Sequence, residues 1–183
     1  MNILSKYGLL QFRNNARIYN KSVIKSLQLF KEETKLLKTL LFLSYKYDEL
    51  EELDSAINFL KGFRILIHVD YILEEITSED KMVTKRIQEQ IEDKIKKSRK
   101  FIFIATENAI SSKHCKWQIR YANTQKSIDH IAILPIREDY ADYSGKEYLQ
   151  KYPYIQKNEM NPIVYEVKFP NGDIIELGDW LAL

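Results

Sequence analysis

Side chains that can hydrogen-bond, carry charge or stack on a flat ligand gather in three short segments, each soon after an apolar run. The first is Ser44-Tyr45-Lys46, the second is Asp70-Tyr71, and the third spans 111–118 with the sequence SSKHCKWQ. The third segment supplies Ser112, His114, Trp117 and Gln118. Hydroxyl, ammonium and aromatic groups at one place are typical of a site that binds a polar organic ligand.

Other kinds of site find little support. The five glycines are scattered and form no glycine-rich phosphate loop. His68, His114 and His130 lie far apart and none belongs to a metal-binding motif, so no metal is expected. Cys115 is expected to be a small buried residue, because no histidine lies in an activating motif with it.

Apolar runs and charged helical segments alternate along the chain from Leu40 onward. The runs are short and rich in β-branched and aromatic residues, as in strands covered on both faces. They lie at 40–43, 65–69, 101–105 and 131–134. Between them, apolar residues recur at helical steps of three and four, at Leu50, Leu53, Ile57 and Leu60, and again at Val83, Ile87, Ile91 and Ile95. This pattern predicts an α/β fold with a doubly wound parallel sheet in the order 2-1-3-4-5.

Two regions flank this pattern. Residues 1–38 are predicted to be an N-terminal helical extension, and 39–183 the main domain. The first 31 residues carry six basic and no acidic side chains. This segment therefore either touches a membrane surface or an acidic partner, or docks on the main domain or on a second subunit.

At the other end of the chain, Asn171-Gly172 lies between two candidate strands, 163–169 and 174–177, and predicts a hairpin. The tyrosine-rich stretch 139–157 is expected to be a long surface loop with one helical turn.

The predicted sheet brings the three polar segments to one place. Ligands of open parallel sheets bind beyond the carboxyl ends of the strands, where the connections diverge, here between the first and third strands. Ser44-Tyr45-Lys46 leave the first strand, Asp70-Tyr71 the second, and Thr106-Glu107-Asn108 the third. Ser111 or Ser112 is expected to cap the next helix, with Gln118 close to its inward face.

The same segments resemble the sequence boxes of Toll/interleukin-1 receptor (TIR) domains. LLFLSYKYDE (40–49) is similar to the opening box, a buried strand that ends in serine and an aromatic residue. ILIHVD (65–70) and the loop as far as Lys81 are similar to the second strand and the long loop after it. SSKHCKWQI (111–119) resembles a pattern with tryptophan, cysteine and, three residues later, glutamate. The likeness covers roughly Leu40 to Pro135, with all three boxes in order.

This resemblance implies an enzyme with NAD as its substrate and no bound cofactor. Many TIR domains cleave the bond between nicotinamide and ribose, and some cyclise or transfer the ADP-ribose to make a signalling nucleotide. The glutamate of the last box is catalytic, because a carboxylate on the ribose hydroxyls stabilises an oxocarbenium-like transition state. The resemblance further implies bacterial anti-phage signalling, a homo-oligomer of TIR domains, and a separate effector that senses the product.

The chain departs from this pattern at two positions of the last box. Gln118 stands at the place of the catalytic glutamate, and His114 at that of the tryptophan. Loss of the charge is expected to lower turnover by about two to four orders of magnitude. Three explanations stay open: an engineered replacement of a native glutamate, a natural domain that binds without cleaving, or another carboxylate, such as Glu107, that acts instead.

The other roles implied by the resemblance each have a structural alternative. Ser44 and Lys46 would contact the phosphates or ribose, although Ser44 could instead close the strand end with a hydrogen bond. Tyr45 would stack on a ring or simply pack, and Asp70 would orient the ribose or cap its loop. Trp117 would lie in the site or face a partner.

Two rival functions also fit the sequence: a non-catalytic TIR adaptor that self-associates through the loop 70–81, and a nucleoside-processing enzyme on a related sheet. Composition also limits the class of partner and the cellular compartment. The net charge of +2, from 28 basic and 26 acidic side chains, does not point to nucleic acid. The single cysteine, the short apolar runs and an N-terminus without secretory features predict a cytoplasmic protein with no membrane span.

Overall fold

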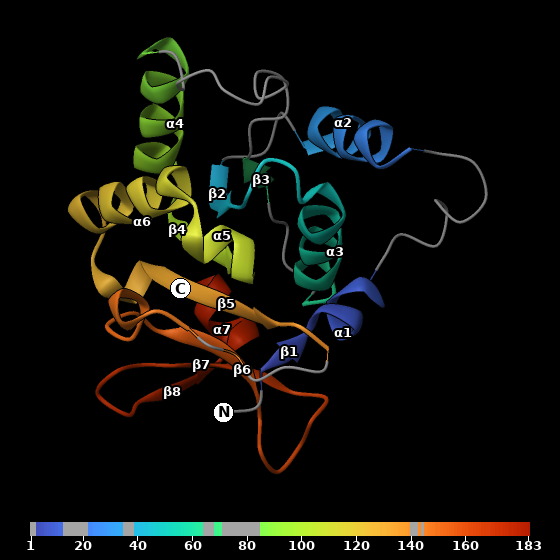
Figure 1. Cartoon of the computed structure of the whole chain (residues 1–183). Helices are drawn as coiled ribbons and strands as arrows, with labels where there is room; N and C mark the ends of the chain where they lie inside the picture. The colour runs from blue at the N-terminus through green and yellow to red at the C-terminus, as the bar shows by residue number, and fades with distance from the viewer. Residues whose placement is uncertain are drawn as a thin grey trace.

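One mixed β-sheet with helices on both faces organises the chain (Figure 1). The computed structural model describes residues 3–12, 22–34, 39–63, 68–70, 85–139, 143 and 145–183. The strand order is β3-β2-β4-β5-β6-β7-β8, and β1 pairs with β5. The five strands β3-β2-β4-β5-β6 carry the predicted order 2-1-3-4-5, which is confirmed.

The parallel strands arise where the apolar runs were found. They are β2 (Thr39–Ser44), β3 (His68–Asp70), β4 (Lys100–Ala105) and β5 (Ile131–Arg137). Three of the predicted runs match these strands closely. Of the run 65–69, only the last two residues lie within the described part of the chain, and they begin β3.

Helices follow the strands as the helical spacing predicts. They are α3 (Leu50–Lys61), α4 (Lys85–Lys97), α5 (Glu107–Ser111) and α6 (Lys113–Gln125). The predicted apolar face of α4 is confirmed, because Ile87, Ile91 and Ile95 are all buried. Val83 lies outside the described residues.

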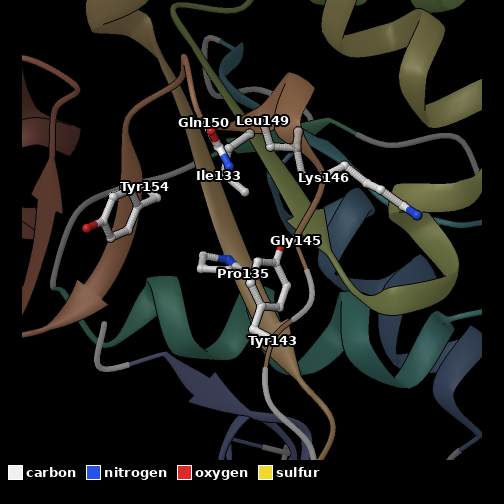
Figure 2. A pocket seen from close by; sticks show the side chains of 8 residues that line it. All are labelled: Ile133, Pro135, Tyr143, Gly145, Lys146, Leu149, Gln150 and Tyr154. Atoms are coloured by element: carbon white, nitrogen blue, oxygen red, sulfur yellow. The ribbon is translucent and has the colours of Figure 1, made fainter.

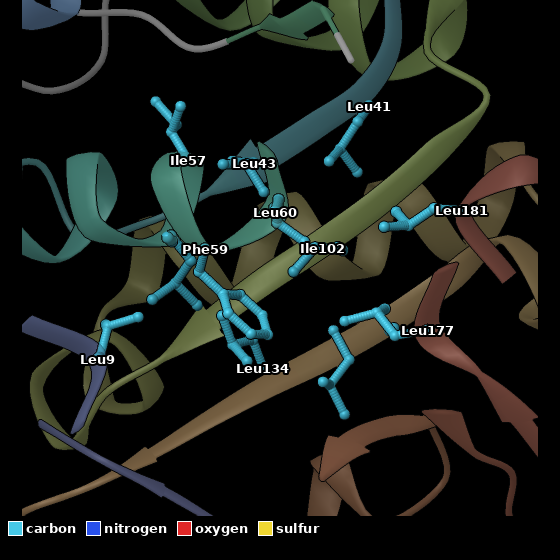
Figure 3. Packing of buried hydrophobic residues seen from close by; sticks show 14 of the residues in the cluster. Leu9, Leu41, Leu43, Ile57, Phe59, Leu60, Ile102, Leu134, Leu177 and Leu181 are labelled. Carbon is cyan, nitrogen blue, oxygen red and sulfur yellow. The ribbon is translucent and has the colours of Figure 1, made fainter. Parts of the chain in front are cut away.

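Side chains that alternate along β4 feed two separate hydrophobic clusters. Ile102 and Ile104 pack on the face covered by α3 and by α7 (Leu177–Ala182). Figure 3 shows this cluster, with Leu60 of α3 next to Ile102. Phe101 and Phe103 belong to the opposite cluster, with residues of α4 and α6. Each such buried side chain stabilises the fold by about 1.5–3 kcal/mol.

The fifth strand is where the sequence prediction was wrong. Strand β6 (Tyr154–Lys157) lies inside the stretch that was expected to be a surface loop, and it pairs parallel with β5. Its inward Gln156 is buried, and the side-chain amide donates to a carboxylate oxygen of Glu166 at 2.7 Å. Because this buried position holds a polar residue, the strand does not appear in the sequence as an unbroken apolar run. The predicted helical turn is present as the 3₁₀ helix Glu147–Leu149.

The C-terminal hairpin is confirmed, but as an antiparallel addition after β6. Its strands are β7 (Tyr165–Lys168) and β8 (Ile174–Glu176), so the hairpin begins two residues later than expected. Gly172 in the connecting turn has a φ of 97°, a conformation that glycine adopts without strain.

The N-terminal extension is helical as expected, and it also adds a strand. It contains β1 (Leu4–Ser5), α1 (Lys6–Leu10) and α2 (Val23–Thr34), and β1 pairs parallel with the end of β5. Leu9 and Leu27 are buried in the α3-side core, and Lys6 forms an ion pair with Glu52 at 3.1 Å. These contacts support the docked alternative for the described part of the basic segment. The expected boundary at residue 38 falls outside the described residues.

Among the helices that the structure describes, none combines the length and apolar character that crossing a bilayer requires.

Candidate functional site

Ser44 and Gln118 meet at the carboxyl end of β2, as the sequence predicts. Ser44 ends the strand, and the second turn of α6 brings Gln118 over it. The Ser44 hydroxyl donates a hydrogen bond to the side-chain oxygen of Gln118. Both residues are buried, with exposed fractions of 0% and 5%. Position 118 therefore lies over the end of β2, where it lines a small cavity together with Tyr45 and His114.

His114 completes a chain of three hydrogen-bonded side chains. Its Nε2 lies 2.8 Å from Nε2 of Gln118, one turn further along α6. An amide NH₂ can only donate, so His114 accepts through Nε2, and its proton is then assigned to Nδ1. Burial lowers the pKa of His114, which favours this neutral form. The order of donation is Ser44 to Gln118 to His114.

Aromatic side chains continue from His114 along α6. The His114 and Trp117 ring centroids are 5.5 Å apart, and those of Trp117 and Tyr121 are 6.2 Å apart. Trp117 is only partly buried, and it packs against the core cluster of this face. The two alternatives predicted for Trp117 both remain, because its ring lies next to that of His114 and is only partly buried.

The cavity at Gln118 is small. Its volume is about 10 Å³, room for about one water molecule. Tyr45, Tyr47 and His114 are among the residues that line it. Tyr45 is also part of the α3-side core, and burial raises the pKa of its hydroxyl. The packing role expected as the alternative for Tyr45 is therefore present in this conformation.

Three other residues named in the sequence analysis, Lys46, Ser112 and Cys115, have structural roles in this conformation. Lys46 forms an ion pair with Asp48. Ser112 caps α6, because its hydroxyl accepts from the backbone N–H of Cys115 at 3.4 Å. Cys115 is fully buried, and burial raises its pKa to about 11, as expected of a core residue and not of a nucleophile.

Glu49 is a buried carboxylate near this site that the sequence analysis missed. It precedes α3, and it accepts hydrogen bonds from Thr106 at 2.6 Å and from Asn108 at 3.2 Å. Burial raises the pKa of Glu49, although these two hydrogen bonds act in the opposite direction. The sequence feature that could have predicted Glu49 as a site residue is its position shortly after the polar segment Ser44-Tyr45-Lys46.

The remaining predicted residues are not brought into the hydrogen-bonded chain. Asp70 ends β3, and its side chain is outside the described part of the molecule, as are Tyr71 and the rest of the loop 70–81. Glu107, the alternative carboxylate, begins α5 after the Thr106 cap.

A cavity of about 290 Å³ lies on the same sheet face, beside β5, and none of the predicted site residues lines it. Figure 2 shows Ile133 and Pro135 of β5 between the rings of Tyr143 and Tyr154. Its walls are mostly apolar. The candidate site is therefore placed at Gln118, where buried polar groups converge, in spite of the smaller space there.

Comparison with known families decides the identity of the fold. The family described as "TIR domain" matches residues 41–163, which include most of β2, all of α6 and the Ser44–Gln118 contact. The chain belongs to the TIR domain family. The α/β fold described above is thus that of a TIR domain.

A curated relative of this TIR domain is a Bacillus cereus (strain MSX-D12) protein named "Probable 3' cyclic ADP-D-ribose synthase ThsB'". The two sequences are 28% identical over 119 residues. The match covers 64% of this chain and spans 60% of the length of the relative.

Proposed function

We propose that this TIR domain binds NAD in the crevice at Gln118 and cleaves the bond between nicotinamide and ribose. The product would be an ADP-ribose-derived nucleotide that a separate effector senses in bacterial anti-phage defence, inside the cytoplasm. The observation that carries the proposal is the burial of Gln118 against Ser44 at the switch point of the sheet. The name of the Bacillus cereus relative, "Probable 3' cyclic ADP-D-ribose synthase ThsB'", supports the same substrate class.

The bond cleavage leaves an electron deficiency on the ribose, because the bonding pair departs with nicotinamide. In this chain, the Gln118 oxygen can accept from a ribose hydroxyl in place of Ser44. Neutral His114 can take the proton of the attacking hydroxyl only after its ring moves away from Gln118, because the Gln118 amide now occupies the Nε2 lone pair. Water or a second ribose hydroxyl then forms the new bond to the anomeric carbon. An amide stabilises the developing positive charge less than a carboxylate does, so this form is expected to be slow.

Substrate entry requires the crevice to open. Sites for small molecules usually have volumes of about 300–1,000 Å³, far above the 10 Å³ at Gln118. Tyr47 is among the more exposed of the lining side chains and can move without disturbing the core. Binding of NAD is therefore expected to displace Tyr47 and the His114 ring.

The test is release of nicotinamide from NAD, followed by chromatography. Gln118→Glu is expected to raise the rate by about two to four orders of magnitude. Gln125→Glu, at the exposed end of the same helix, is the matched control and should leave the rate unchanged. If Gln118→Glu stays inert at every protein concentration, including those at which the domain self-associates, the catalytic proposal is wrong.

A second candidate is a TIR domain that binds nucleotide or other TIR domains without cleaving. The hydrogen bonds through Gln118 favour it, because Ser44, Gln118 and His114 pair with one another without a carboxylate. This candidate predicts a thermal shift with NAD, or a rise in light scattering on self-association, and no nicotinamide from either form of the protein.

A further inference from the structure

A second polar cavity lies at the opposite end of the parallel strands from Ser44. Lys100 is the first residue of β4, whereas Ser44 ends the neighbouring strand β2. The cavity has a volume of about 380 Å³. Its lining combines Lys100 and Trp180 with the 3₁₀ helix Ile128–His130 and the β7–β8 hairpin. This lining shares no residue with the cavity at Gln118.

The Lys100 ammonium group is buried with few partners. The residue is 3% exposed, and its Nζ lies 4.5 Å from the centroid of the Trp180 ring. Its hydrogen bond to the backbone oxygen of Asp129 is long, at 3.4 Å. That oxygen already accepts from the Trp180 indole N–H at 2.8 Å. Among the ion pairs between described residues, none includes Lys100.

The neighbouring charges act on this amine in both directions. Burial and the positive charge of Arg99 lower the pKa of Lys100 to about 8, and Asp129 acts against them. His130 and Asp173 also line the cavity. A lysine buried among apolar groups and next to another cation has the setting of an amine nucleophile.

We propose that Lys100 is a reactive amine that takes small, uncharged aromatic aldehydes from this cavity as a Schiff base. Trp180 and Phe169 are among the residues that line the cavity, so its lining is partly aromatic. The carboxylates of Asp129 and Asp173 disfavour an anionic aldehyde.

In the reaction, the nitrogen lone pair attacks the carbonyl carbon, and the C=O π electrons move to oxygen. Both amine protons and that oxygen then leave as water, and a C=N bond remains. The inference is independent of the proposed cleavage of NAD.

The test uses the intact protein with benzaldehyde and sodium cyanoborohydride, which reduces the imine to a stable benzyl amine. Peptide mapping then gives the labelling rate of each lysine. At pH 7.5, Lys100 is expected to react roughly a hundredfold faster than an ordinary exposed lysine, because a much larger fraction of its amine is uncharged. Its rate should reach half of its maximum near pH 8. Lys97, which is 69% exposed on α4, is the comparison residue and should label more slowly than Lys100 at pH 7.5.

Variants and a second aldehyde make the outcome decisive. Lys100→Met, checked for folding by circular dichroism and melting temperature, should lose the fast labelling, whereas Lys97→Met should keep it. Glyoxylate, an anionic aldehyde, should label Lys100 more slowly than benzaldehyde does. Equal labelling of Lys100 and the exposed lysines, or no label on Lys100 at any pH, would overturn the proposal.

Discussion

The side-chain amide of Gln118 donates to His114 across one turn of α6, with 2.8 Å between the two Nε2 atoms. This contact fixes the orientation of the amide, so that its oxygen faces the hydroxyl of Ser44. In the family pattern, tryptophan and glutamate stand at these two positions, and that pair cannot form the same bond. His114 and Gln118 therefore form a complementary donor–acceptor pair, which favours a site in which residue 118 carries an amide.

The pH dependence of stability should report the His114 contact. Burial lowers the pKa of His114, so the folded protein binds fewer protons at this residue than the unfolded chain does. The stability that this contributes is complete above the unfolded pKa, about 6.5. It is lost as the pH falls through the folded pKa.

His114→Gln keeps an accepting oxygen and should flatten this loss. The measurement is urea unfolding between pH 7.5 and pH 5. His130→Gln is the comparison, because burial and the charge of Lys100 lower the pKa of His130 as well. This variant should remove a separate part of the pH dependence, and the effects of the two substitutions should add. A His114→Gln protein with the same pH profile as the parent would contradict the assigned contact.

Glu49 should act on stability with the opposite sign. Burial raises its pKa above 4.5, so the folded protein holds this proton more tightly, and stability falls as the pH rises from 4.5 through the folded pKa. Glu49→Gln should remove that fall while keeping an acceptor for Thr106. The free energy of unfolding at pH 4 and pH 8 measures it, with Glu51→Gln on the exposed face of α3 as control. A pH profile equal to that of the parent would show that Glu49 is solvated.

Prediction from the sequence succeeded where burial alone selects the residues. Strands β4 and β5 are covered on both faces, so nearly every residue is apolar and the run is visible. Strand β6 escaped because Gln156 is buried through a partner ten residues away, on a strand that comes later in the chain. Glu49 escaped for the same reason, since its donors are Thr106 and Asn108. In the site, topology alone was enough to bring Ser44 and Gln118 together.

The buried hydrogen bond between Gln156 of β6 and Glu166 of β7 leads to a further prediction. Glu166 is 5% exposed, and its two oxygens accept from Gln156 and Asn158, each at 2.7 Å. Glu166→Ala would leave both amides without their acceptor and should lower the free energy of unfolding by about 1–3 kcal/mol. Glu176→Ala is the matched control, because Glu176 lies opposite Glu166 on β8 and is exposed. It should change stability by less than about 0.5 kcal/mol. Equal losses in chemical denaturation would rule out a special role for the pair.

Ser44 is expected to lower the pKa of a carboxylate placed at position 118. In the Gln118→Glu background, the Ser44 hydroxyl would donate to a carboxylate, and such a bond stabilises the charged form and lowers its pKa. Adding Ser44→Ala should therefore raise that pKa and move the acidic limb of the rate profile for nicotinamide release to higher pH.

A loss of packing alone would lower the rate equally at all pH values and leave the limb in place, so the position of the limb isolates the hydrogen bond. Ser111→Ala, at the exposed end of α5, should not shift it. An unmoved limb in the Ser44→Ala double variant would show that the hydroxyl only fills space beside residue 118.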